Sequence, residues 1–240
     1  MLEIQKFTVK KQEKELLKNI NLSVSKNEGI VVFGPNGGGK STFFKSIMGI
    51  GDFQVSGKVT FNKKNILDLD IEKKVQLGIN YLYQTAPLVK GVELSNLLAL
   101  MSGFKGTFEE LYEEMREPLK SLDMEYLFDR EINVGLSGGE VKRSELLTLS
   151  LLKDSKIYLL DEPDSGVDIE NVKRLGNFIN TMVKGKSYMI VTHSGEILKY
   201  LNPDRGIVIM NGELVFEGDV NEILKEVRKN GYSNFSTKQS

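Results

Sequence analysis

Short apolar runs separated by turn residues fill the first third of the chain. The clearest run is Gly29–Phe33, which stops at Gly34 and is typical of a buried strand. A helix is predicted directly after it, over 40–48. Four further strands are predicted in this part of the chain, at 4–9, 20–24, 58–61 and 79–83.

Apolar residues recur at helical spacing between about residues 87 and 153. They do so around 94–101, over 109–122 and over 137–152. Because no alternating segment interrupts them, this stretch is predicted to be an all-helical insertion.

Strands and helices alternate again after residue 153. Strands are predicted at 157–160, 188–192, 207–210 and 214–216, and helices from Asp168 to about residue 183 and over 220–228. Asn211-Gly212 separates the last two strands and is a strong signal for a two-residue hairpin. The last dozen residues are expected to be frayed.

These patterns predict an α/β fold with a mixed, mainly parallel sheet core, an antiparallel β part and a helical subdomain insertion. No internal repeat or low-complexity linker interrupts the chain. We expect one domain over 1–240, with its core at 1–86 and 154–240 and the helical subdomain at about 87–153.

Composition excludes several classes of site. The chain has 240 residues, no cysteine and one histidine, so disulfides, thiolate metal sites and multi-histidine sites are excluded. The net charge of −1 argues against nucleic-acid binding through bulk positive charge.

No segment has the length and polarity of a membrane span. The cleanest apolar stretch, 94–104, has 11 residues and already contains Ser95 and Asn96. The N-terminus has no cationic start leading into an apolar run. We therefore expect a soluble, cytoplasmic protein without direct membrane insertion.

A phosphate-binding loop pattern, G-x-x-x-x-G-K-S, lies between the buried strand and the helix that follows it. Its glycines let backbone amides approach phosphate oxygens, Lys40 reaches the β- and γ-phosphates, and the Ser41 hydroxyl can hold Mg²⁺. The alternative is a plain glycine-rich turn. The predicted nucleotide-binding residues here are Gly34, Pro35, Asn36, Gly37, Gly38, Gly39, Lys40, Ser41 and Thr42.

Two carboxylates end the apolar strand predicted at 157–160. Asp161 is placed to hold Mg²⁺, and Glu162 is a candidate base for the attacking water. Acidic turn residues often end strands, so the assignment depends on the phosphate loop elsewhere in the chain.

The sequence Leu136-Ser137-Gly138-Gly139-Glu140 opens a predicted helix. Ser137 and Glu140 have the spacing of a capping box. Two glycines in a first turn cost roughly 1 kcal/mol each, however, and bare amides at a helix start suit a γ-phosphate. Ser137, Gly138 and Gly139 are therefore candidate phosphate-binding residues.

Together these motifs resemble the ATP-binding-cassette (ABC) ATPases, a P-loop NTPase family, over nearly the whole chain. The resemblance implies ATP and Mg²⁺ as cofactors. It implies that Gln84 contacts Mg²⁺ and the attacking water, that Asp168 lies at a dimer seam, and that His193 contacts the γ-phosphate. For Asp168 the alternative is a helix N-cap, and both roles can hold.

The resemblance also implies a head-to-tail dimer, in which the helix starting at Ser137 faces ATP held by the other chain. One family feature is missing. Many of these ATPases stack adenine on an aromatic residue after the first strand, where this chain has 9–14 without an aromatic and only Phe7 nearby.

Within the family, the chain is similar to the SufC-type ATPase of the SUF iron–sulfur cluster assembly system. Glu140 stands where most transporter cassettes have glutamine. The similar segments are 133–145, 164–169, 190–193, 197–204 and, loosely, 84–87. The likeness implies a soluble SufB/SufD-type scaffold as partner. The alternatives are the nucleotide-binding subunit of a membrane transporter, with a permease partner, and, more weakly, a kinase or GTPase.

Overall fold

The computed structural model describes residues 1–240 except 84–89, 133, 193–194 and 236–240. Its strands are β1 (Leu2–Lys11), β2 (Lys14–Val24), β3 (Gly29–Phe33), β4 (Gln54–Phe61), β5 (Lys64–Asn65), β6 (Ile79–Leu82), β7 (Ile157–Asp161), β8 (Ser187–Val191), β9 (Arg205–Met210) and β10 (Glu213–Gly218). Its α-helices are α1 (Lys40–Met48), α2 (Ile71–Gln76), α3 (Leu94–Ser102), α4 (Phe108–Ser121), α5 (Gly138–Ser150), α6 (Ile169–Met182) and α7 (Val220–Asn230). Short 3-10 helices lie at η1 (Glu125–Leu127), η2 (Glu196–Tyr200) and η3 (Ser233–Phe235).

The larger sheet has six strands in the order β10-β9-β3-β8-β7-β6. All neighbours from β9 to β6 are parallel, and β10 pairs with β9 in the antiparallel sense. The carboxyl ends of β3 and β7 therefore meet at one edge, where the phosphate loop and the two carboxylates follow them. The mixed, mainly parallel sheet predicted from the sequence is confirmed.

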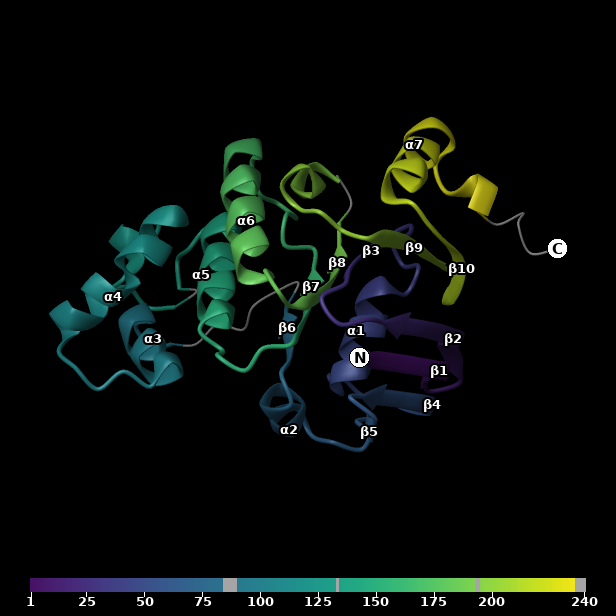
Figure 1. Ribbon diagram of the computed structural model, residues 1–240, viewed down its shortest axis with the longest axis horizontal. Helices are drawn as coiled ribbons and strands as arrows, with labels where there is room; N and C mark the ends of the chain where they lie inside the picture. Colours follow the sequence, from purple (N-terminus) through teal and green to yellow (C-terminus); the bar gives the residue numbers. More distant parts are fainter. Residues whose placement is uncertain (84–89, 133, 193–194, 236–240) are drawn as a thin grey trace.

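Helix α1 packs between this sheet and a smaller sheet of order β2-β1-β4-β5 (Figure 1). One buried cluster joins the inner face of the smaller sheet, one side of α1 and one face of the larger sheet. Phe43 and Phe44 of α1 are fully buried in it, and the Phe43 ring meets that of Phe7 edge-on at 6.1 Å. This packing fixes where α1 begins, and so where the phosphate loop that leads into it ends.

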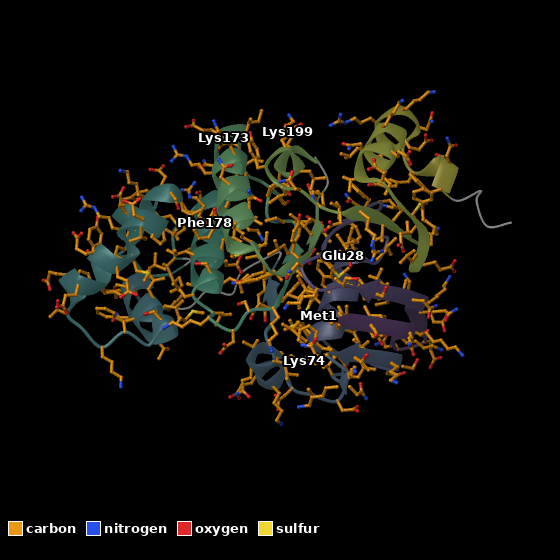
Figure 2. The ribbon with its side chains drawn as sticks, viewed as in Figure 1. Met1, Glu28, Lys74, Lys173, Phe178 and Lys199 are labelled. Atoms are coloured by element: carbon orange, nitrogen blue, oxygen red, sulfur yellow. The ribbon has the colours of Figure 1, made fainter. Side chains whose placement is uncertain are left out.

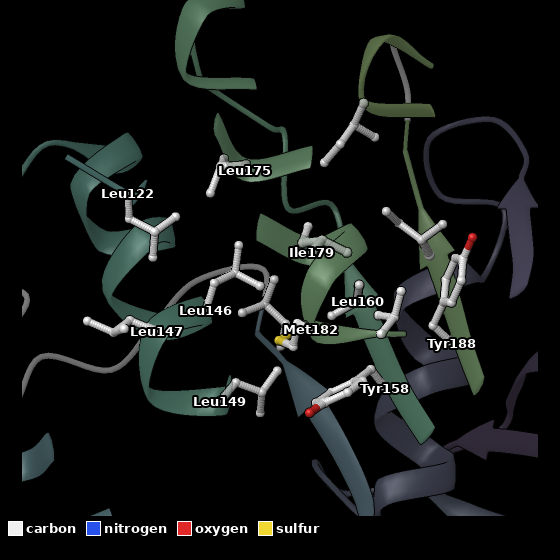
Figure 3. Close-up of a cluster of buried hydrophobic side chains, with 14 of the residues drawn as sticks. Leu122, Leu146, Leu147, Leu149, Tyr158, Leu160, Leu175, Ile179, Met182 and Tyr188 are labelled. Atoms are coloured by element: carbon white, nitrogen blue, oxygen red, sulfur yellow. The ribbon is translucent and has the colours of Figure 1, made fainter. Parts of the chain in front are cut away.

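The opposite face of the larger sheet is covered by α5 and α6 (Figure 3). Alternation along β7 divides its side chains, because Tyr158 and Leu160 face this cluster whereas Ile157 and Leu159 face α1. Leu146 of α5 packs in the same cluster. The helix that begins with the second glycine motif is thus anchored directly on the strand that ends in Asp161.

The elements described between β6 and β7 are all helices, as the helical spacing of the apolar residues predicted. Helices α3 and α4 lie at one end of the molecule, and α5 lies between them and the sheet (Figure 1). Thr107 caps α4 through a capping box with Glu110. Among the residues described, every helix is too short or too polar to span a bilayer.

One buried charge lies away from the candidate site. Lys74 of α2 is fully buried, and its Nζ has no hydrogen-bond partner among the described groups (Figure 2). It lies beside Gly49, which ends α1. Burial lowers the pKa of Lys74, while the Asp68 and Asp70 carboxylates act in the opposite direction, and the carbonyl end of a helix also favours a cation.

The expectation of a frayed C-terminus is wrong up to Phe235. Helix α7 continues to Asn230, and η3 follows it. Phe235 is buried, with its ring 5.3 Å from that of Phe216. The segment is ordered because an apolar side chain at its end reaches the β9–β10 hairpin.

Candidate active site

The phosphate loop leaves β3 and enters α1 through backbone conformations that need glycine. Gly39, the N-cap of α1, has φ 111°, and Gly37 has φ 74°. At Gly34 a Cβ atom would lie 2.0 Å from the Ile209 carbonyl oxygen, so the loop packs directly on β9. Gly212 of the β9–β10 hairpin donates to the Gly38 carbonyl at 3.0 Å. The hairpin therefore supports the loop from behind.

Lys40 is the buried cation of this loop. Its Nζ donates to the carbonyls of Gly34 at 2.8 Å and Pro35 at 2.9 Å. Burial lowers the pKa of Lys40, while the Glu162 and Asp161 carboxylates act in the opposite direction. The ammonium is therefore held at the floor of the loop by carbonyl oxygens and two nearby negative charges.

A cavity of about 450 Å³ opens over the loop. Its lining consists of Asn36, Gly37, Gly38, Gly39, Lys40, Ser41, Thr42, Glu162 and Ser165. Backbone amides at the start of a helix, one lysine and three hydroxyls suit a phosphate chain. The structure thus brings the loop and Glu162 together, as the sequence predicted.

Asp161 is fully buried at the end of β7 and accepts two hydrogen bonds. Ser41 donates to Oδ1 at 3.0 Å and Tyr81 donates to Oδ2 at 2.9 Å. Burial raises the pKa of Asp161, and the two hydrogen bonds oppose that rise. Burial first, and then the Asp161 charge, raise the pKa of Tyr81, so its hydroxyl keeps its proton and donates.

The oxygens of Ser41 and Asp161 fit Mg²⁺. This cation prefers hard oxygen ligands and is usually held by one or two carboxylates together with substrate phosphates. The described part of the chain contains no cluster of three or more acidic or histidine side chains that could hold a metal ion.

Glu162 follows Asp161 in a left-handed conformation, with φ 53°. Its backbone amide donates to the Val191 carbonyl at 3.1 Å, and its side chain is 6% exposed. A non-glycine residue in this region costs energy and is held there by its surroundings, often at functional sites. The conformation lets its side chain line the cavity.

Ser137 caps α5 as predicted. Its hydroxyl accepts from the Glu140 amide at 3.3 Å, and Oε2 of Glu140 accepts from the Ser137 amide at 2.7 Å. Oε1 of Glu140 accepts from the Tyr126 hydroxyl at 2.5 Å. These hydrogen bonds, with that of Tyr126 the largest, lower the pKa of Glu140 to about 2.

Gly138 and Gly139 have no packing reason to be glycine among the described residues of this chain. A Cβ atom at either position would meet no heavy atom of these residues within 4 Å, and neither glycine has a positive φ. Ser137, Gly138 and Gly139 do not line the cavity over the phosphate loop of their own chain. The cavity over the phosphate loop is therefore formed without the second glycine motif.

Asp168 is the N-cap of α6, which confirms the structural alternative for this residue. Its Oδ1 accepts from the Asn171 amide at 3.0 Å, and its Oδ2 accepts from the Asn171 side chain at 2.6 Å. Arg143 of α5 donates to the Asn171 side chain at 2.7 Å. Ile169 beside it is 80% exposed, so this end of α6 presents an apolar residue to solvent.

Gln84 and His193 lie outside the described residues. Phe7 is fully buried against α1, so it offers no face for stacking adenine. The sequence did not point to Tyr81, which donates to Asp161, or to Lys142. Lys142 donates to the Tyr83 carbonyl at 2.5 Å. A tyrosine in a fully buried strand and a lysine on a buried helix face were the available signals.

A sequence model described as ABC transporter matches residues 17–165. The chain is 36% identical over 243 residues to the "probable ATP-dependent transporter ycf16" of Trieres chinensis, covering 97% of this chain and 96% of that protein. It is 35% identical over 243 residues to a "probable ABC transporter ATP-binding protein" of Streptococcus pyogenes, covering 97% and 94%.

A solved structure has the same fold. It is described as a dimeric post-hydrolysis state of an ATP-binding cassette bound to ADP and Pi. It is 25% identical, with a TM-score of 0.76 over 92% of this chain and 99% of that one. With a family match over more than half of its length, this chain belongs to the ABC transporter family: it is an ATP-binding cassette and an ATPase of the ABC type.

Proposed function

We propose that two copies of this chain bind two Mg·ATP molecules between them and use hydrolysis to move a partner protein. The observation that carries the proposal is the meeting of Lys40, Ser41 and Glu162 at one cavity, with Asp161 buried behind it on the Ser41 hydroxyl, while the glycines at the start of α5 are not part of the cavity lining. Each site would then be completed by a second chain.

Each residue at the cavity has a proposed task. The loop amides and Lys40 bind the phosphates, and Ser41, Asp161 and Gln84 would hold Mg²⁺, which supplies positive charge to the phosphate oxygens. Glu162 is the base that takes the proton of the attacking water. His193 would contact the γ-phosphate.

The glycines of α5 support the composite site. Their cost in helix stability has no return in the described part of one chain, because a Cβ atom at either position would contact none of its atoms within 4 Å. Two unhindered amides at the positive end of α5 would face the γ-phosphate of the other chain, with Ser137 beside them and Asp168 at the seam. The dimeric solved relative is consistent with this arrangement.

A direct contact within the chain supports the transmission of dimer closure to a partner protein. Lys142 of α5 donates to the carbonyl of Tyr83, the residue before Gln84. We propose that the helical subdomain of about 87–153 moves relative to the core of 1–86 and 154–240 when the dimer closes. Because Lys142 joins α5 to the end of β6, such a movement would shift the segment that contains Gln84.

The partner proposed is a soluble SufB/SufD-type scaffold for iron–sulfur cluster assembly. The similarity to SufC-type ATPases over 133–145 and 164–169 supports it, and so does Glu140, which this chain ties to both Ser137 and Tyr126. The chain has no cysteine, so a cluster would be held by the scaffold.

A membrane permease is the second candidate partner. The names of the similar proteins from Trieres chinensis and Streptococcus pyogenes, which refer to transporters, favour it. Affinity purification of the chain from native extract separates the two candidates. A soluble partner that binds iron supports the scaffold, and a membrane protein in its place would contradict it.

Mixing two inactive variants tests the composite site. Lys40→Ala inactivates the phosphate loop of the chain that carries it, and Ser137→Arg blocks the start of α5 in the other chain. A mixed dimer keeps one intact site, so ATP hydrolysis should return when the two are combined. The matched control combines Lys40→Ala with a Lys40→Ala, Ser137→Arg double variant, which leaves no intact site. Equal rates in both mixtures would contradict the proposal.

A further inference from the structure

Tyr81 reaches the candidate metal site from a strand that carries none of the recognised motifs. It is 6% exposed, and its hydroxyl donates to Oδ2 of Asp161 at 2.9 Å. Ser41 donates to the other oxygen, Oδ1, at 3.0 Å. The carboxylate is thus fixed from two sides, by one residue of α1 and one of β6.

Strand register explains how Tyr81 reaches Asp161. In the parallel pair of β6 and β7, Tyr81 is opposite Leu159. Asp161 is two residues beyond Leu159 in β7, so its side chain lies on the same side of the sheet. That is the side packed on α1, which carries Ser41 near its start. Side chains from α1 and β6 therefore meet at the carboxylate that β7 carries.

The hydroxyl group, rather than the ring, needs an explanation. A phenylalanine would fill the same space and keep the edge-on contact with the Tyr83 ring, whose centroid is 4.9 Å away. It would leave Oδ2 of a fully buried carboxylate without this donor. Hydrogen bonds to buried charged groups are among the stronger ones in proteins.

We propose that Tyr81 is a positioning residue for Mg²⁺: it holds Asp161 in the orientation in which its carboxylate can serve the cation. The inference rests on the proposed function, since it takes Asp161 as part of the magnesium site. Residues that orient metal ligands typically contribute 10- to 100-fold to metal affinity. Tyr81 would act through Asp161 without touching ATP.

The test compares Tyr81→Phe with the parent chain and with Tyr83→Phe. Tyr83 is the matched control, because it lies next to the same strand and its ring contacts that of Tyr81, while the hydrogen bonds to the Asp161 carboxylate in the described structure come from Ser41 and Tyr81. Binding of a fluorescent ATP analogue is titrated at increasing free Mg²⁺ and again in EDTA. Mn²⁺ binding to the nucleotide complex is followed separately by electron paramagnetic resonance.

We expect the free Mg²⁺ for half-maximal nucleotide binding to rise roughly 10- to 100-fold in Tyr81→Phe. Mn²⁺ affinity should fall by a similar factor, while binding in EDTA stays within about twofold. Tyr83→Phe should match the parent in every titration. The thermal midpoint of each variant, measured without nucleotide, shows that it is folded.

Two results would overturn the inference alone: an unchanged Mg²⁺ dependence in Tyr81→Phe, or an equal loss of nucleotide binding with Mg²⁺ and in EDTA. A different result would overturn the proposed magnesium site itself. In that case the parent chain would bind nucleotide equally well with Mg²⁺ and in EDTA.

Discussion

The Nζ atom of Lys142 lies 3.9 Å from Oε2 of Glu145, one turn further along α5, and the two side chains are only 6% and 12% exposed. This oxygen has no hydrogen-bond donor in the part of the chain that is described. Burial raises the pKa of Glu145 to about 7, and the Lys142 ammonium opposes that rise. A buried carboxyl group in the helix of the glycine motif therefore titrates near neutral pH.

The free energy of unfolding should fall with pH because of Glu145. Its carboxyl binds a proton more tightly in the folded chain than in the unfolded chain, where the pKa is 4.5. The stabilisation is present at low pH and is lost as pH rises toward 7. Glu145→Gln does not titrate, so its stability relative to the parent should rise by up to about 3 kcal/mol between about pH 5 and pH 8.

Urea unfolding at several pH values measures this difference. The control is Glu113→Gln, because Glu113 is an exposed residue of α4 whose side chain is 65% exposed. Its profile should run parallel to that of the parent. A parallel profile for Glu145→Gln would show that the carboxyl has an ordinary pKa.

Lys40→Ala should lose ATP hydrolysis by at least about a hundredfold, because it removes the side-chain cation of the phosphate loop. Nucleotide affinity should fall roughly 10- to 100-fold, the scale of hydrogen bonds to charged groups. Steady-state hydrolysis and fluorescent nucleotide titration measure the two effects. Lys18→Ala is the control, since Lys18 is an exposed residue of β2 that pairs with Glu213. Normal turnover in Lys40→Ala would refute the assignment of the loop.

Phe235→Ala should destabilise the folded chain by about 2–4 kcal/mol, because it empties a buried position. Its ring packs on Phe216 and lies 6.3 Å from that of Tyr232. Thermal unfolding measures the change, and Lys229→Ala at the exposed end of α7 is the control. Equal midpoints for the two variants would mean that the C-terminal segment contributes nothing to stability.

The sequence predicts β3 and α1 with their observed bounds, because a continuous apolar run and the phosphate loop give strong local signals. β1 is longer than predicted. A register shift between Ile4 and Phe7 breaks the alternation of its buried side chains, and Lys6 has a positive φ there. A period-two pattern cannot cross such a bulge. The short elements α2 and β5 carry too few residues to show any period.

Residues of the candidate site that belong to local motifs were predictable, whereas those brought there by strand order were not. Lys40, Ser41 and Glu162 line one cavity, and Asp161 is buried next to it, where it accepts a hydrogen bond from Ser41. Tyr81 reaches Asp161 only because β6 lies beside β7, and 80 positions separate the two residues in sequence. The order of strands in the sheet is a property of the whole fold, so no local pattern shows it.

Sedimentation velocity of Glu162→Gln tests the central claim, a site shared between two chains, most directly. This variant keeps the shape of the side chain and loses its basicity, so hydrolysis should slow by at least about a hundredfold and ATP should remain bound. We expect a dimer in saturating Mg·ATP and a monomer in Mg·ADP, with Ser137→Arg abolishing the dimer. A Glu162→Gln chain that remains monomeric in saturating Mg·ATP, alone and with its partner added, would contradict the account.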